Sequence, residues 1–488
     1  MKTEDTIRLG LSLPMFLASL LALCTGIFPG LLGVWLWNAW RIAVPEYIKV
    51  GHAHAAWWSV LILIAGILLP GLHLKPRLRK FVLTTSFVAV PAWMAALAVY
   101  YIRKAARGVI APLPLSPGAE PNVEYLTYGT GIFAIEVWFF TALALVFLAA
   151  LGVRRLCRPE LLGSRFDFVT RVEIPRRIFR VPLIVAPLAL LVGWEMTLGF
   201  KSRGLAIEPA ALVQLHSHTL FFAVGYLMTL IAMCALGVNN RVFHLAYRLG
   251  NLAIPLIVAA WTAFSFLELQ SLVHVAPAAL YFALVVLGFA ALLGRFGLKD
   301  PEALHCDFIR HAMVYTWLLM VLLVAVGPVI SLGWDTDPNV TVTYSQPQGL
   351  SYPGPYPEKY VGTAPVANSP RGLENLHLSP GSWSHVALFW LLALLLTGKR
   401  IEQTLGRPGL LFMLATMIPL APILNAFGRV AAWADLPSGI GGMWFAAHPL
   451  MFFNVFVLAG MVVTVMRRLV QEEKAEIVES AKNMALAW

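Results

Sequence analysis

The sequence predicts an all-α polytopic membrane protein with twelve transmembrane helices, and three observations carry that prediction. Hydrophobic residues make up 59% of the 488-residue chain and charged residues only 12%, far from the balance of a soluble domain. Apolar runs of about 18 residues or more, the length that a helix needs to cross a bilayer, recur along the chain. The Lys and Arg residues behind the net charge of +11 concentrate in alternate connections between these runs.

The apolar runs define the predicted helices in order. The first run follows a short basic start and lacks a small-residue cleavage site, so it is interpreted as a span and not as a signal peptide. The tenth run is the shortest. The predicted spans cover residues 11–34, 53–72, 81–102, 126–152, 179–200, 213–237, 250–268, 275–295, 310–333, 385–398, 408–427 and 447–466.

Positive charge predicts which connections face the cytoplasm. The basic connections are 73–80, 153–180, 294–300 and 398–407, and loops rich in Lys and Arg tend to stay inside. Both termini are therefore expected to be cytoplasmic, with the protein in the plasma membrane of a prokaryote. The positive charge is explained by topology, so we expect the lipid bilayer and no nucleic acid as a partner.

Residues 1–466 are predicted to form one transmembrane domain with two further segments attached to it. The outer loop 331–383 is rich in Pro, Gly, Tyr and Ser; it is interpreted either as a passive cap or as a docking surface for an electron-transfer partner. The tail 467–488 is predicted to be a cytoplasmic helix. None of the four cysteines lies in a CxxCH or CxxC motif, so we expect neither a covalently attached haem nor a disulfide.

Histidines recur at the outer ends of every fourth span. His52 and His54 open the second span, His216 and His218 open the sixth, and His385 opens the tenth. His54 and His218 are 164 residues apart, and His218 and His385 are 167 residues apart. This period predicts three pseudo-repeated four-helix arcs, at about 9–153, 178–296 and 308–466.

Two more histidines, His274 and His448, lie at the outer ends of the eighth and twelfth predicted spans. The candidate cofactor-binding residues are therefore His52, His54, His216, His218, His385 and His448, and the candidate metal ligands are His54, His218, His385 and His274. Four other histidines fall on the cytoplasmic side and are left out of the site: His73, His244, His305 and His311.

The spacing within each pair predicts that its histidines serve different centres. Residues i and i+2 of a helix point about 200° apart, so they cannot bind one metal together. Neutral imidazole ligates haem iron, zinc and copper, and a histidine inside a membrane is a functional hypothesis by default. Haem fits best, because a bundle lined by Trp and Phe offers apolar slots and axial ligation needs no covalent link. Each single histidine also has an ordinary interfacial interpretation, and the repeat favours ligation.

This arrangement of spans and histidines resembles subunit I of the haem-copper oxidases. The resemblance covers nearly the whole chain as topology, and it implies b-type haem near the outer face. It implies that His54 or His52 ligates one haem with His385, and that His216 or His218 belongs to a second site. The chain departs from the family in three ways: span 6 lacks an HPEVY-like segment, span 7 lacks a His-His pair, and span 10 has one histidine where the family has two. These departures make copper the less favoured cofactor.

The HAH stretch also resembles the WHAHE stretch of NnrS-type haem proteins, which are connected with nitric oxide stress, although Ala55 replaces the acid. Polar residues elsewhere in the spans add candidates with open roles. Glu136, Glu195 and Glu268 are interpreted either as proton-carrying or quinol-binding carboxylates or as structural partners of Lys201, Arg429 or an imidazole. Asn425 and Arg429 are candidates for steadying haem propionates.

The leading functional hypothesis is a haem-binding membrane oxidoreductase or electron-transfer subunit, with oxygen or nitric oxide reduction left unassigned. The second hypothesis is a copper or zinc transporter that captures metal with the same histidines; such a path should continue inward through Met, Cys or acidic ligands. Cys234 with Met228 and Met233 is the nearest approach to that path. The third is a structural anchor of a redox complex that has lost its cofactor.

Overall fold

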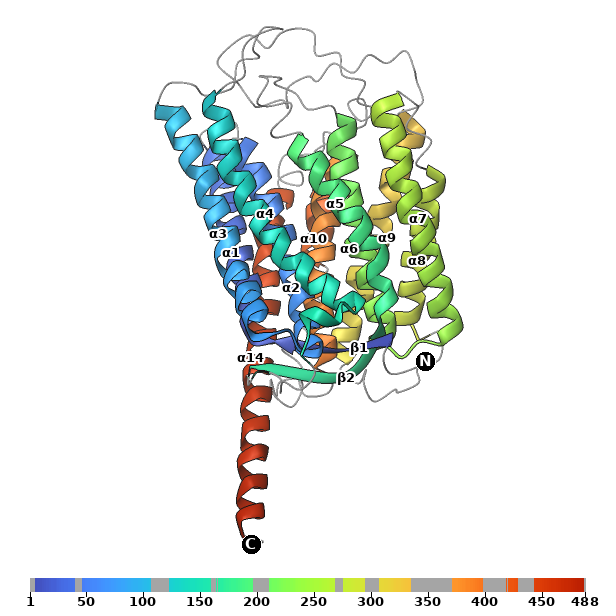
Figure 1. Ribbon diagram of the computed structural model, residues 1–488. Helices are drawn as coiled ribbons and strands as arrows, with labels where there is room; N and C mark the ends of the chain where they lie inside the picture. The colour runs from blue at the N-terminus through green and yellow to red at the C-terminus, as the bar shows by residue number, and fades with distance from the viewer. Residues whose placement is uncertain are drawn as a thin grey trace.

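The protein is a bundle of long helices with a small sheet at one end (Figure 1). The computed structural model describes residues 5–39, 46–106, 123–158, 164, 166–195, 210–267, 275–294, 307–334, 371–397, 418, 420–428 and 443–486. Within these residues, eight helices are long and apolar enough to cross a membrane, and shorter apolar stretches lie in three more. The predicted α-helical polytopic membrane protein is therefore confirmed.

The long helices follow the predicted spans in order. Those described are α1 (Leu13–Ala39), α2 (Glu46–Leu72), α3 (Pro76–Ala106), α4 (Val123–Leu151), α5 (Arg180–Trp194), α6 (Ala210–Ala235), α7 (Asn240–Leu267), α8 (Val275–Leu292), α9 (Asp307–Trp334), α10 (Arg371–Leu396) and α14 (Met443–Leu486). They match predicted spans one to ten and twelve. Of the predicted span 408–427, the structure describes only Ile418 and residues 420–427, which are helical. The count of twelve and the threefold repeat stay predictions.

A two-stranded antiparallel sheet is the element that the sequence did not predict. It pairs β1 (Thr6–Ser12) with β2 (Asp167–Pro175), so that Thr6 lies opposite Pro175 and Ser12 opposite Asp167. The first predicted span began at Leu11, but the chain is extended until Ser12 and becomes helical at Leu13. β2 lies in the basic connection 153–180, where charged residues obscured a strand whose alternate side chains are buried.

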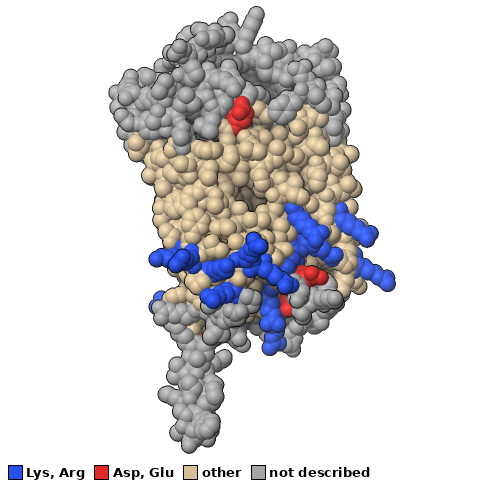
Figure 2. All heavy atoms as spheres, viewed as in Figure 1, with Lys and Arg blue, Asp and Glu red and all other residues tan. Residues whose placement is uncertain are grey.

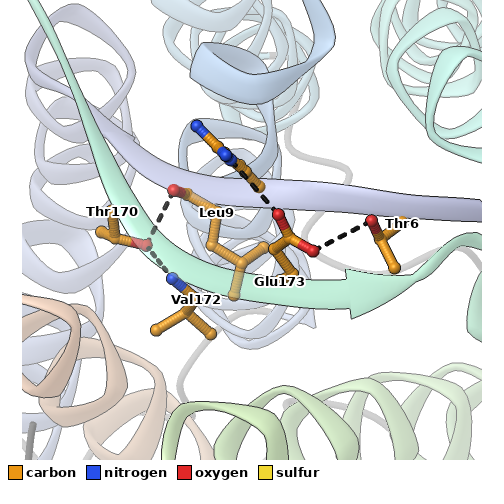
Figure 3. Close-up of polar contacts among 6 residues, drawn as sticks. Thr6, Leu9, Thr170, Val172 and Glu173 are labelled. Carbon is orange, nitrogen blue, oxygen red and sulfur yellow. Dashed lines mark hydrogen bonds and ion pairs between the residues drawn. The ribbon is translucent and has the colours of Figure 1, made fainter. Parts of the chain in front are cut away.

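Side-chain hydrogen bonds reinforce the sheet (Figure 3). The Thr170 hydroxyl donates to the Leu9 carbonyl at 2.8 Å and accepts from the Val172 amide at 3.1 Å. Glu173 accepts a hydrogen bond from the Thr6 hydroxyl at 3.2 Å. The Thr170–Leu9 and Thr6–Glu173 bonds join segments that are more than 160 residues apart in the chain, and so tie the first helix to the start of α5.

The sheet packs directly against the end of α2. Ile7, Leu9 and Leu11 of β1 are fully buried. At Gly71 of α2, a Cβ atom would overlap the backbone of Arg8, so only glycine permits this close approach. The sheet thus closes one end of the bundle, and its ladder has one register shift, between Arg8 and Gly10.

The three helices that carry the predicted histidines form the centre of the bundle. α10 contacts both α2 and α6. In α2 and in α6, 78% of the most apolar window is buried, compared with 33–44% in α3, α4, α5, α7 and α8. In α10 every residue from Trp383 to Leu396 is buried. Side chains on these three helices therefore meet protein on most sides, whereas the peripheral helices expose apolar faces to the bilayer.

The two ends of the bundle differ in charge. The described chain begins and ends at the same end, which also contains the sheet (Figure 1). Lys and Arg side chains gather in the half of the molecule near this end (Figure 2), and we call it the basic end. The helices α4, α6 and α8 finish there at Gly152, Gly237 and Gly294, whose positive φ angles stop a helix at little cost.

Two predicted boundaries need correction. The outer loop was placed at 331–383, but α9 continues to Trp334 and α10 already begins at Arg371, leaving 335–370 outside the described residues. The polar composition before Trp383 concealed a helix that extends outward from a well-packed apolar segment, because tertiary packing outweighs local propensity. The predicted tail 467–488 is helical as far as Leu486, as the continuation of α14, and its cytoplasmic location stays a prediction.

Candidate functional site

The two histidines of α2 contact different neighbouring helices, as their spacing predicts. His52 turns to α1, where its Nδ1 lies 3.2 Å from the Gly26 carbonyl oxygen. His54 turns to α3 and α6, and its ring lies against Trp93 with the ring centroids 5.4 Å apart. Both rings lie in the half of the bundle away from the basic end, because about 24 Å of helix separates His54 from Pro70 beside the sheet.

The two histidines of α6 diverge in the same way. The Nδ1 atom of His216 lies 2.7 Å from the Ala189 carbonyl oxygen of α5. The ring of His218 stacks on Trp261 of α7, with the centroids 5.2 Å apart and the planes 28° apart. Each HxH pair thus directs one imidazole to each side of its helix.

One imidazole from each pair meets the other at the α2–α6 contact. The rings of His54 and His216 stack with centroids 5.9 Å apart and planes 24° apart. Gly193 of α5 provides the space for this contact, since a Cβ atom there would lie 2.7 Å from Cε1 of His216. Histidines from the first and second predicted arcs therefore converge, although they are far apart in the sequence.

A half-buried carboxylate lies at the other side of the same cluster. Glu136 of α4 accepts hydrogen bonds from the indole of Trp93 at 2.8 Å and from the indole of Trp194 at 2.7 Å. Each indole donates to a different carboxylate oxygen, and no cation pairs with Glu136 among the described residues. Trp93 therefore connects Glu136 with His54. We call His54, His216, Trp93, Trp194 and Glu136 the histidine–glutamate cluster.

His385 lies in a second aromatic environment at the centre of the bundle. Its side chain is fully buried, and its ring lies 4.0 Å from Phe221 and 6.0 Å from Trp57 between ring centroids. Gly225 of α6 leaves room beside it: a Cβ there would lie 3.5 Å from Nε2 of His385 and would overlap the Tyr281 hydroxyl. The Tyr281 side chain is fully buried, and its hydroxyl has no hydrogen-bond partner within the described part of the chain.

The other predicted residues do not contribute to the histidine–glutamate cluster or to the surroundings of His385. Glu195 is exposed at the end of α5, and Asn425 is fully buried near the end of its helical segment. His274, Glu268, Lys201 and Arg429 lie outside the described residues, as do His305 and Cys306. His448 lies in α14, but its side chain is not described.

Sequence reasoning missed the residues that surround the histidines. Trp93 and Trp194 were not singled out, because an indole in an apolar span has an ordinary place at a membrane interface. No local sequence feature marks Gly193 or Gly225 as part of a site. Tyr281 lies on α8, whereas the resemblance to the haem-copper oxidases predicts a tyrosine on the sixth span. A single acidic residue in a span, such as Glu136, predicts that hydrogen-bond donors surround its carboxylate, but the sequence does not indicate which helices supply these donors.

A search of the described residues finds no group of three or more His, Cys, Asp or Glu side chains that could hold a metal ion. The free thiols Cys24, Cys157 and Cys234 lie apart from the histidine–glutamate cluster, and burial raises the pKa of Cys157, although Arg176 and Lys75 favour its thiolate. Comparison of the chain with protein-family models, curated proteins and solved structures finds no match.

Proposed function

We propose that this protein is a haem-binding integral membrane oxidoreductase or electron-transfer subunit similar to subunit I of the haem-copper oxidases. Histidines of α2, α6 and α10 would hold b-type haem in the half of the bundle away from the basic end. The observation that carries the proposal is the hydrogen bonding of the imidazoles at Nδ1.

A backbone carbonyl only accepts hydrogen bonds. The Nδ1 atom of His216, 2.7 Å from the Ala189 oxygen, must therefore carry the proton, and the same argument applies to His52 beside the Gly26 oxygen. In a neutral imidazole, Nε2 then presents its lone pair. Metal-ligating histidines usually have this second hydrogen bond, which orients the ring and fixes the tautomer.

The surroundings of the histidines fit a porphyrin better than a bare ion. A haem needs only one or two axial side chains, so it does not require the group of three ligands that a zinc or copper site would use. Trp57, Phe221 and Phe222 supply aromatic surface between His218 and His385. Copper remains the less favoured second cofactor.

When bound, haem supplies one-electron transfer; the chain supplies orientation and charge. His216 is held by the Ala189 carbonyl and by the gap at Gly193. Glu136 places a carboxylate, held by two neutral donors, beside the His54–Trp93 contact. A fixed negative charge in a medium of low dielectric constant stabilises positive charge nearby, such as that of a cationic centre or a proton.

The topology belongs to the same proposal. Twelve spans in three arcs would put the basic end in the cytoplasm of a prokaryote, with both termini there, and the histidines near the outer face. An electron-transfer partner would then dock on the outer loop, in residues 335–370. The resemblance to NnrS-type proteins keeps nitric oxide among the substrates to be tested.

The deciding experiment is a reduced-minus-oxidised spectrum with haem extraction from the purified protein. We expect b-type bands, and single replacements His54→Ala, His216→Ala and His385→Ala should each remove a spectral component. His311→Ala, at the exposed start of α9, is the matched control and should leave the spectrum unchanged. Absence of extractable haem would overturn the proposal, and bound zinc or copper in its place would favour a transporter.

The same variants decide the ligand pairing. The resemblance predicts that His54→Ala and His385→Ala lose one shared component. The ring contact between His54 and His216 predicts instead that these two variants behave alike. Independent losses in all three variants would break both pairings.

A further inference from the structure

The basic end contains a set of basic residues that form no ion pair with a carboxylate of the described residues. Elsewhere at this end, Arg79 pairs with Asp167, Arg176 donates to the Ala149 and Ala150 carbonyls, and Arg310 donates to the Leu292 carbonyl. By contrast, one set of basic residues, on α7, at the start of α5 and on the 3-10 turn Arg176–Phe179 just before it, has no carboxylate partner among the described residues. We call it the α5–α7 basic cluster: Arg177, Arg180, Arg241, His244 and Arg248.

Arg177 is held in place at the centre of this cluster. Its Nη2 lies 2.8 Å from Nδ1 of His244, and its guanidinium carbon lies 4.8 Å from the ring centroid of Tyr247. Because guanidinium only donates hydrogen bonds, Nδ1 of His244 accepts, and the Nε2–H of that neutral ring is a further donor. Arg241 and Arg248 are three and four residues from His244, so they project from the same side of α7.

The helices α5, α6 and α7 contain no compensating acid. No Asp or Glu occurs in residues 176–194 or 210–267, which include the described parts of α5, α6 and α7. Several donors therefore converge without an acceptor of the opposite charge, which is the arrangement that recognises a phosphate group.

Above the cluster, both helices turn apolar side chains outward. On α5, Arg180 is followed on the same face by Ile184, Leu188 and Leu191, which are 72%, 36% and 57% exposed. On α7, Arg248 is followed at four-residue intervals by Leu252 and Leu256, which are 53% and 42% exposed. The two helices run in the same direction and contact each other. On each of them, an arginine near the basic end is followed by a row of exposed apolar side chains toward the middle of the bundle.

The dimensions of this surface match one leaflet. Arg180 and Leu191 are about 16 Å apart along the helix, close to half of the roughly 30 Å hydrocarbon core. Basic residues between helices on the cytoplasmic side are known to bind the headgroups of anionic lipids. A free phosphate ion would use the cluster but would gain nothing from the apolar columns.

We propose that α5 and α7 form a binding site for an anionic phospholipid. The α5–α7 basic cluster takes the headgroup phosphate, and the acyl chains lie along Ile184, Leu188 and Leu191 on α5 and along Leu252 and Leu256 on α7. This site is independent of the haem proposal, since it lies at the opposite end of the bundle from the histidine–glutamate cluster.

The test is the association of spin-labelled phosphatidylglycerol and phosphatidylcholine with the purified full-length protein in bilayers, measured by electron paramagnetic resonance. The wild type should prefer the anionic probe. The double variant Arg177→Gln/Arg248→Gln should lower that preference at least threefold, given roughly 1 kcal/mol for each basic residue near an anionic surface. The matched control Arg77→Gln/Lys80→Gln removes two exposed charges from the start of α3 and should lower it less than half as much.

Arg177→Lys keeps the charge but not the planar guanidinium that lies on Tyr247 and bonds to His244. The Arg177→Lys variant should lose part of the preference for phosphatidylglycerol although its net charge is unchanged. It also provides a test if the double variant does not fold. Equal losses in the cluster variant and the α3 control would overturn the proposal in favour of general attraction to the basic end. Displacement of the probe by inorganic phosphate would overturn it in favour of an ion site.

Discussion

The carboxylates Asp167 and Glu136, at the two ends of the bundle, have opposite kinds of partner; Asp167 is buried and Glu136 is half-buried. At the basic end, Asp167 is 1% exposed and lies 2.7 Å from a guanidinium nitrogen of Arg79. In the other half, Glu136 meets only the two neutral indole donors among the described residues. The first charge is cancelled within the fold, and the second is solvated by hydrogen bonds but not cancelled.

The difference separates a structural group from a functional one. The Arg79–Asp167 ion pair connects α3 to β2 and therefore stabilises the packing of the sheet against the helices. A carboxylate without a counter-ion in a membrane interior is costly, and such residues usually serve binding or proton transfer. The neighbouring imidazoles His54 and His216 are where a compensating positive charge would lie. Four substitutions test this contrast.

The largest effect on stability is expected from Arg79→Gln. It leaves the Asp167 carboxylate buried without a cation, which should lower the free energy of unfolding by about 3–5 kcal/mol. Chemical denaturation in detergent, followed by circular dichroism, measures the change. Adding Asp167→Asn to the same chain should restore a large part of the loss; no recovery would mean that packing, and not charge, makes this contact important.

Gly193→Ala should disturb the histidine–glutamate cluster with a smaller effect on stability. The added Cβ would lie 2.7 Å from Cε1 of His216, so the ring must move away from the Ala189 carbonyl. Overpacking of this kind costs roughly 1–3 kcal/mol. We expect the unfolding free energy to fall by that amount and the proposed haem band of His216 to shift or disappear.

The control for this substitution is Gly131→Ala in α4, where an added Cβ meets no atom within 4 Å. It should leave the spectrum unchanged and raise the free energy of unfolding by up to about 1 kcal/mol, the helix preference of alanine over glycine. If both variants retain the wild-type spectrum, His216 is not an axial ligand.

Glu136→Gln should change the midpoint potential of the proposed haem more clearly than it changes the free energy of unfolding. The amide offers one oxygen to two indole donors, so one N–H loses its acceptor at a cost of about 1–2 kcal/mol, part of which is offset by removing a buried charge. Loss of the negative charge disfavours an oxidised cationic centre, so the midpoint potential should rise in a spectroelectrochemical titration. Glu195→Gln, at an exposed position, is the control, and an equal rise there would remove Glu136 from its assigned role.

The smallest effect is expected from Arg8→Gln. Its ion pair with Glu173 spans 3.3 Å at the surface, with the two side chains 67% and 41% exposed. Solvent screens such pairs, so the loss should be about 0–1 kcal/mol. Unfolding measured in parallel with Arg79→Gln would show a similar loss only if the sheet, and not the burial of the pair, governs stability at this end.

The sequence predicted the helices well because a bilayer imposes a simple length and polarity rule on each span. The apolar runs match α2, α3, α4 and the helices that follow to within a few residues at most ends. It also predicted the divergence of His52 from His54, which follows from helix geometry alone. The sequence did not predict the strands β1 and β2, because they pair across more than 150 residues and neither contains an apolar run of its own.

For the site, composition and spacing by themselves determined which helices carry histidines and at which end these lie. Tertiary structure alone decided that His54 meets His216, that two tryptophans from α3 and α5 hold Glu136, and that Tyr281 comes to lie beside His385. Side-chain rows along one helix are set by local geometry, whereas contacts between helices depend on their rotation and on gaps such as Gly193, which only packing of the whole bundle determines.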